Sequence, residues 1–174
     1  MMEQVILIDE NDNEIGLMEK LEAHQKGLLH RAFSVLIFNS KGELLLQKRA
    51  DGKYHSAGLW TNTCCSHPLP NENMADACKR RLKQEMGIEV KPVYAFKFLY
   101  KIKLDNGLTE HELDHVYFGV YDDEPYLNED EASDWMFVNI EALKTDMQQF
   151  PEKYTHWFQL IIFHPEFNPT LIEA

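Results

Sequence analysis

The sequence of 174 residues lacks a long apolar run. Near the start, the apolar stretch 5–8 is flanked by polar and acidic residues, and no basic segment precedes it. A membrane-spanning helix needs about 20 apolar residues, and a signal peptide needs a basic start followed by about 7 to 15 apolar residues. We therefore expect neither export nor a membrane anchor.

Positive charge and cysteine are also scarce. Lys and Arg number 17 against 29 Asp and Glu, and the net charge of −12 argues against nucleic acid or an anionic membrane as partner. An anionic ligand would need a site that is locally basic. The three cysteines, Cys64, Cys65 and Cys78, form no spaced framework of the kind found in small secreted domains. This predicts a reducing, cytoplasmic location.

Glycine and proline are few, at 8 and 7, while 44% of the residues are hydrophobic, which predicts a single globular domain over residues 1–174. Strand-like and helix-like segments mix without strict alternation, so we expect an α+β fold, a mixed β-sheet with helices packed on it. The expected strands are 5–8, 32–38, 43–48, 93–104, 115–121 and 135–138. The expected helices are 17–25, 73–86, 140–149 and 154–163.

The expected helix 73–86 aims one carboxylate inward. At 100° per residue its apolar side chains cover an arc of about 120°, and Glu85 falls inside that arc with Arg81 at its edge. An isolated buried charge costs several kcal/mol or more, so Glu85 must be paired or coordinated. A simple ion pair with Arg81, four residues away, competes with a metal or phosphate role.

A second set of carboxylates stands in EHELDHVYFGVY, residues 110–121. If this segment is extended, Glu110, Glu112 and Asp114 share one face, with Glu110 and Glu112 about 7 Å apart. Adjacent acids repel one another unless a cation lies between them. The alternatives are a cation site and a solvated strand edge.

Thiols and imidazoles gather in TNTCCSHP, residues 61–68. Neighbouring cysteines cannot easily reach disulfide geometry, so Cys64 and Cys65 are buried fillers, metal ligands or reactive thiols. His24, His30 and His67 lie beside expected turns, and imidazole with carboxylate suits zinc, manganese or iron. Their spacing matches no zinc-finger pattern.

Residues 66–88 resemble the Nudix box, a loop, helix and loop with a fixed spacing of Gly, Glu, Arg and paired Glu. The spacing holds at Glu72, Arg80, Leu82, Glu85 and Gly87. It fails where Ser66, Arg81 and Gln84 replace a glycine and two acids. Those acids hold the divalent ions that activate water in Nudix hydrolases, so we expect diphosphate hydrolysis to be lost.

The chain from about residue 4 to 163 is similar to type I isopentenyl diphosphate isomerase, a Nudix-fold enzyme that interconverts isopentenyl and dimethylallyl diphosphate. The resemblance implies a Nudix-type mixed sheet sandwiched by helices. It rests on separated segments: 20–24, 29–33, 58–62, 65–68, 80–87, Tyr100, 110–112 and Trp157.

The resemblance also implies the ligands of the site. One divalent ion, Mn²⁺ or Zn²⁺, would be surrounded by His24, His30, His67, Glu110 and Glu112. A second ion, Mg²⁺, would be held by Glu85, the backbone carbonyl of Cys65 and the substrate diphosphate. The positions that match diphosphate contacts are Lys20, Arg49, Lys53 and Arg81, which would supply the local basic patch.

The implied reaction moves a double bond by one carbon, adding a proton at C4 and removing one from C2 through a tertiary cation at C3. Glu112 with Tyr100 would form the acid side, and Cys65 the base on the opposite wall. Trp157 and Trp60 would offer π faces to the cation. Cys64 and Cys78 would be core. The alternatives are a degenerate Nudix diphosphate hydrolase and a non-catalytic diphosphate-binding module.

Overall fold

The computed structural model describes residues 2–53 and 55–172, which build a mixed β-sheet around strand β3. The strands are β1 (Gln4–Ile8), β2 (Glu14–Glu19), β3 (His30–Phe38), β4 (Leu44–Arg49), β5 (Trp60–Thr61), β6 (Cys64–Ser66), β7 (Val93–Lys103), β8 (Thr109–Val120) and β9 (Ala132–Val138). The helices are α1 (Lys20–Lys26), α2 (Met74–Met86), α3 (Ile140–Gln149) and α4 (His156–Ile162), with 3₁₀ turns at Pro151–Lys153 and Pro169–Ile172.

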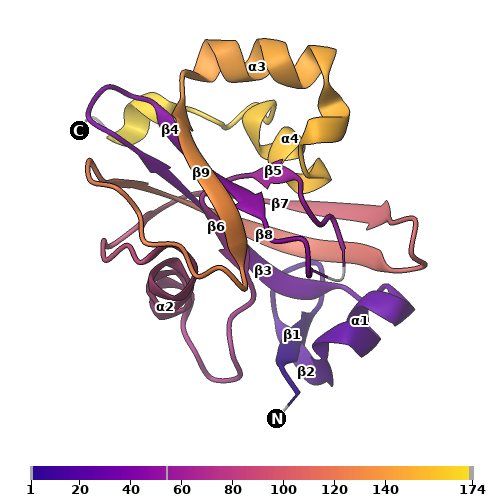
Figure 1. Cartoon of the computed structure of the whole chain (residues 1–174). Coiled ribbons are helices and arrows are strands. Elements are labelled where there is room, and N and C mark those ends of the chain that lie inside the picture. Colours follow the sequence, from indigo (N-terminus) through magenta and orange to yellow (C-terminus); the bar gives the residue numbers. More distant parts are fainter. Residues whose placement is uncertain (1, 54, 173–174) are drawn as a thin grey trace.

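Strand β3 is the strand on which the functional elements converge (Figure 1). It runs parallel to β8 over its whole length and antiparallel to the short strand β6. Strand β8 pairs with β7 on its other side, and β4 pairs with β9 and β5. The expected turn between β3 and β4 is present, but the two strands pair only at Phe38 and Leu44 before they diverge.

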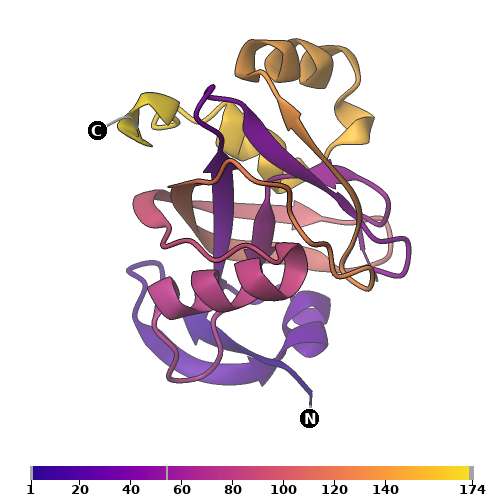
Figure 2. The same cartoon turned by 60° about the vertical axis from the view of Figure 1, so that its left-hand side comes forward.

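Helices cover both faces of the sheet, as Figure 2 shows for α2 in front and α4 behind. Side chains of β3 alternate between two apolar clusters because successive residues of a strand face opposite ways. Val35 and Ile37 pack with α2, whereas Leu36 and Phe38 pack with α3 and α4. The predicted α+β arrangement, a mixed sheet between helices, is confirmed.

Helix α2 has the predicted bounds because both of its ends carry capping residues. The side chain of Asn73 accepts a hydrogen bond from the backbone N–H of Asp76 at 2.8 Å, and Gly87 adopts the left-handed conformation past the end, with φ 65°. Among residues 2–53 and 55–172, no helix is both long and apolar enough to cross a membrane.

Two expected helices begin too early. Residues 17–19 belong to β2, where Leu17 pairs with Ile6, and α1 begins only at Lys20 after Glu19 caps its first N–H groups. Helix α4 begins at His156, because Tyr154 forms a parallel bridge with Trp60 and Thr155 is the extended N-cap residue. In both cases the residues just before the helix are extended and pair with another strand.

The expected strand 115–121 begins six residues earlier, at Thr109. The turn at 105–107 closes a hairpin, so β7 and β8 pair from Lys103 opposite Thr109 onward. Strand β8 therefore lies inside the sheet, and Glu110, Glu112 and Asp114 are buried. The alternative of a solvated strand edge is wrong.

Candidate active site

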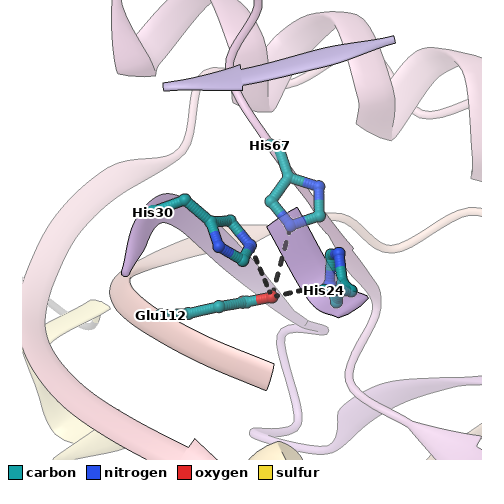
Figure 3. A group of neighbouring side chains, drawn as sticks. All are labelled: His24, His30, His67 and Glu112. Carbon is teal, nitrogen blue, oxygen red and sulfur yellow. Dashed lines mark hydrogen bonds and ion pairs between the residues drawn. The ribbon is translucent and has the colours of Figure 1, made fainter. Parts of the chain in front are cut away.

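Four side chains from separate elements converge on one point (Figure 3). The cluster consists of His24 on α1, His30 on β3, His67 after β6 and Glu112 on β8, whose ligand atoms all lie within 4.8 Å of one another. The Oε1 atom of Glu112 lies 3.7, 3.3 and 3.2 Å from the Nε2 atoms of His24, His30 and His67 respectively. Strand pairing brings these groups together, because Glu112 lies directly beside His30 in the parallel β3–β8 ladder.

The histidine tautomers suit a cation at this point. The Nδ1 atoms of His24 and His30 face the backbone carbonyls of Lys20 at 2.7 Å and Leu28 at 2.9 Å. A carbonyl only accepts, so Nδ1 carries the proton, and in the neutral ring the Nε2 lone pair points at the carboxylate. Lone pairs that face a carboxylate oxygen repel it unless a cation lies between them. Metal-binding histidines show this same carbonyl contact.

The electrostatics of the cluster also call for positive charge. Burial alone would raise the pKa of Glu112, but the imidazoles of His24, His30 and His67 hold that pKa well below its usual range. Burial disfavours the charged form of His24, yet Glu112 outweighs it and raises the pKa of that imidazole. Burial lowers the pKa of His67 to about 4. The donor set, three imidazoles and a carboxylate, fits a divalent ion.

Glu110 lies next to the four-residue cluster without joining it. The hydroxyl of Tyr100 lies 3.0 Å from Oε2 of Glu110 and 3.1 Å from Oε2 of Glu112, so one phenol bridges both carboxylates. Burial and the charge of Glu112 raise the pKa of Glu110 to about 8, which leaves Glu110 protonated at neutral pH. A cation bound here would therefore displace a proton.

A cavity of about 110 Å³ opens beside this cluster and is lined by Cys65, Tyr100, Glu112 and Trp157. Cys65 pairs with Ser34 of β3, four positions along from His30, the residue beside Glu112. At about 3.3 Å per residue, the backbone positions of Cys65 and Glu112 are offset by about 13 Å along β3, and the side chains of both residues line the cavity.

The two tryptophans differ in position. Trp157 is buried in the cavity wall, where its Nε1 donates to Oδ1 of Asn62 at 3.2 Å and its ring lies 5.3 Å from the guanidinium carbon of Arg49. Trp60 packs against the core cluster of α3 and α4 and is not among the residues that line the cavity.

The adjacent cysteines face opposite sides of the sheet. Cys65 lines the cavity, whereas Cys64 is fully buried in the α2 cluster, and its thiol donates to Oε2 of Glu85 at 3.3 Å. Cys78 packs in that same core, and all three thiols are free. Burial raises the pKa of Cys65, with Arg49 acting against it, so Cys65 is a thiol at neutral pH in the protein alone.

The four basic residues predicted to bind diphosphate all line the cavity, but acids accompany them. They are Lys20, Arg49, Lys53 and Arg81. Lys20 pairs with Glu3 at 2.9 Å, and both Lys53 and Arg81 pair with Glu131. The four basic residues thus gather at the cavity as expected, and the acids beside them act as counterions because cations taken out of water need partners.

Glu85 is buried, as the angle of its helix position predicted. It accepts hydrogen bonds from Arg81 at 3.0 Å and from Gln47 at 3.2 Å, so the ion pair considered from sequence exists. Glu85 is not among the residues that line the cavity. Arg81, its ion-pair partner, does line the cavity.

Sequence reasoning assigned no role to seven residues of the cavity wall: Glu3, Phe33, Ser34, His55, Ser66, Asp114 and Glu131. Asp114 had a signal, since strand alternation places it on the same face as Glu110 and Glu112. Its Oδ2 accepts from the hydroxyl of Ser34 at 2.8 Å, its Oδ1 is buried without a partner among the residues that the structure describes, and burial raises its pKa to about 8. Glu3, His55 and Glu131 lie in segments whose approach to the site no local pattern predicts.

Comparison with known proteins agrees with this geometry. The chain matches the NUDIX domain family across residues 28–158. It is 54% identical over 157 residues to isopentenyl-diphosphate Delta-isomerase 2 of Aromatoleum aromaticum, covering 90% of this chain and 83% of that one. It is 55% identical over 157 residues to isopentenyl-diphosphate Delta-isomerase of Pectobacterium atrosepticum, covering 90% and 88%.

The fold is shared with solved structures of lower sequence identity. The crystal structure of DR0079 from Deinococcus radiodurans superposes with a TM-score of 0.77 at 17% identity, covering 92% of this chain and 97% of that one. The chain therefore belongs to the NUDIX domain family, and within it to the isopentenyl-diphosphate Delta-isomerases.

Proposed function

We propose that the protein interconverts isopentenyl diphosphate and dimethylallyl diphosphate by moving one proton on and another off a five-carbon chain. The observation that carries the proposal is the composition of one small cavity. A thiol, Cys65, lines it together with Glu112, Tyr100 and the ring of Trp157. The names of the relatives support the same reaction.

The diphosphate lies at the basic residues of the cavity wall. Lys20, Arg49, Lys53 and Arg81 contact its oxygens, and the guanidinium groups offer paired N–H donors that match phosphate geometry. The buried Nε of Arg49 has no partner among residues 2–53 and 55–172 and is one such donor. Glu85 and the backbone carbonyl of Cys65 would hold Mg²⁺ together with the diphosphate, and the ion would offset part of the negative charge of the diphosphate.

The second divalent ion, Mn²⁺ or Zn²⁺, belongs to His24, His30, His67, Glu112 and the adjacent Glu110. When bound, it supplies the positive charge that the facing imidazole lone pairs and carboxylates lack. The ligand set of nitrogen and oxygen atoms supports these two metals, since both accept imidazole and carboxylate.

Two protein groups exchange protons with the substrate from opposite ends of the cavity. The proton added at C4 comes from the Glu112 and Tyr100 side, where the phenol already hydrogen-bonds the carboxylate. In this direction Cys65 must act as the thiolate: it takes the proton that leaves C2 and becomes the thiol, and the electron pair of that C–H bond becomes the new C2–C3 double bond. In the reverse direction the Cys65 thiol is the acid. Because an alkene is a weak base, the donor must be placed accurately and shielded from water.

Trp157 stabilises the positive charge that develops at C3. A desolvated cation over an aromatic face gains about 2 kcal/mol or more. The ring is held in place by its hydrogen bond to Asn62. Cys65 must remain a free thiol for this chemistry, so a reducing, cytoplasmic location forms part of the proposal.

The test is deuterium incorporation into isopentenyl diphosphate in D₂O, followed by NMR with and without Mg²⁺ and Mn²⁺. Cys65→Ser and Glu112→Gln should each reduce turnover by at least about 100-fold. Cys64→Ser is the matched control, because serine keeps the donor to Glu85 and should retain most activity. Equal losses at both cysteines would contradict the assignment.

Two further assays on the same protein test the two alternative functions. Phosphate release from nucleoside diphosphate derivatives with Mg²⁺ would identify a hydrolase. Binding of dimethylallyl diphosphate without any exchange would identify a non-catalytic module.

A further inference from the structure

A fourth imidazole lies beside the metal-binding cluster and none of the roles above uses it. His55, in the loop between β4 and β5, lines the cavity. Its ring stacks on that of His24 with centroids 6.0 Å apart and planes 29° apart, and it meets the ring of Trp157 edge-on at 5.9 Å. Its Nδ1 atom lies 3.4 Å from Oε1 of Glu110.

The surrounding loop holds this imidazole in position. Arg49 donates from its guanidinium to the backbone carbonyl of His55 at 3.1 Å. The next residue, Ser56, has φ 52°, a left-handed conformation that is uncommon for a residue other than glycine. A non-glycine residue held in this region marks a backbone whose surroundings determine it, and such positions cluster at functional sites.

The two oxygens of Glu110 face different groups. Oε2 accepts from the hydroxyl of Tyr100, whereas Oε1 faces His55. A carboxylate that is held at only one oxygen can rotate about its last bond. Groups that orient the ligands of a metal in this way tune its binding.

We propose that His55 is a positioning residue of the metal centre: once a bound cation has displaced the proton of Glu110, the Nδ1–H of His55 donates to Oε1 of Glu110 and fixes the rotation of that carboxylate beside the cluster. The inference rests on the proposed metal role of Glu110. It extends the set of functional histidines from three to four and gives the loop 50–59 a part in metal binding.

The test compares two amide substitutions with alanine. Asparagine places its NH₂ group where Nδ1 stands, whereas glutamine reproduces Nε2. The dissociation constant of Mn²⁺ is measured without substrate, by chelator competition and by the Mn²⁺ EPR signal. We expect His55→Ala and His55→Gln to weaken binding by about 10- to 100-fold, the usual effect of losing a ligand-orienting partner, and His55→Asn to retain most of the affinity.

Controls separate this inference from its alternatives. Ser56→Ala tests the other neighbour of Nδ1, 3.4 Å away, and should leave the affinity unchanged, as should His156→Ala at an exposed histidine. In a Glu110→Gln background, His55→Ala should add little, because both changes act through the same carboxylate.

The outcomes are distinct. Wild-type affinity in His55→Ala, or equal weakening by asparagine and glutamine, would overturn the role of His55 while leaving the metal centre in place. If the wild type itself binds no Mn²⁺ or Zn²⁺, the metal centre fails, and this inference fails with it.

Discussion

Asp114 offers the sharpest test of the buried charges around the site. Its side chain is 1% exposed, it faces the cavity, and its pKa is raised to about 8 by burial and by the charge of Glu112. The ordinary aspartate pKa is about 3.9. Between these two values the folded protein binds one proton more than the unfolded chain does. The free energy of unfolding therefore falls as the pH rises through this range.

The magnitude follows from that extra proton. While the folded state holds the proton and the unfolded chain does not, the free energy of unfolding falls by about 1.4 kcal/mol for each pH unit. The fall per pH unit becomes smaller near the pKa of the folded state. From pH 6.5 to 8 the contribution of Asp114 is therefore between about 1 and 2 kcal/mol. Glu110 adds a loss of the same sign, because its pKa is also raised to about 8. His55 and His67 have pKa values lowered to about 3 and 4, against about 6.5 in the unfolded chain, so they oppose this trend mainly below about pH 7 and do so equally in the wild type and in a variant at residue 114.

The substitution Asp114→Asn removes the titration and keeps an oxygen that can accept from Ser34. Urea unfolding in metal-free buffer should show the variant gaining between about 1 and 2 kcal/mol on the wild type as the pH rises from 6.5 to 8. Asp122→Asn is the control, because that exposed carboxylate has a lowered pKa and does not titrate in this range. Parallel pH profiles for Asp114→Asn and wild type would refute the reasoning.

Three further predictions concern the helix ends and the metal. Gly87→Ala should lower the free energy of unfolding by at least about 2 kcal/mol, since a Cβ there would lie 2.7 Å from the Cβ of Tyr126. Gly42 is the control, because its backbone is also left-handed but has open space around it, and Gly42→Ala should lower the free energy of unfolding by about 1 kcal/mol. Asn73→Ala should cost about 1 kcal/mol in the same urea assay by removing the cap of α2, and no change would contradict the capping role. Mn²⁺ affinity should rise with pH up to about 8, because the ion displaces the proton of Glu110; calorimetry in two buffers would reveal the released proton, and a flat profile would contradict it.

Local patterns predicted the elements whose ends carry their own signals. Helix α2 has the expected bounds because Asn73 and Gly87 satisfy its terminal backbone groups, whatever packs around it. The inward aim of Glu85 followed from its angle on that helix. The beginnings of α1 and α4 were misplaced, since an apolar pattern does not distinguish a helix from the extended residues that precede it.

For the site, the resemblance to a known family predicted which residues take part, but it did not predict which side chains surround them. His24, His30, His67 and Glu112 come together as the resemblance implied, whereas Glu110 lies outside that group, held by Tyr100. The acids that accompany the basic residues could not be predicted. Glu3 and Glu131 come from the beginning of the chain and from a loop near its end, and no short-range rule relates them to Lys20 or Lys53.

The sequence by itself determined which thiol, imidazoles and carboxylates are available to the site. It also determined which of them share one face of a strand or helix, because the spacing of side chains along a strand or helix is a property of the backbone. Only the tertiary structure decided which side chains lose water together. Charge and pKa at the site depend on that shared desolvation, which β3 creates by pairing with β6 on one side and β8 on the other.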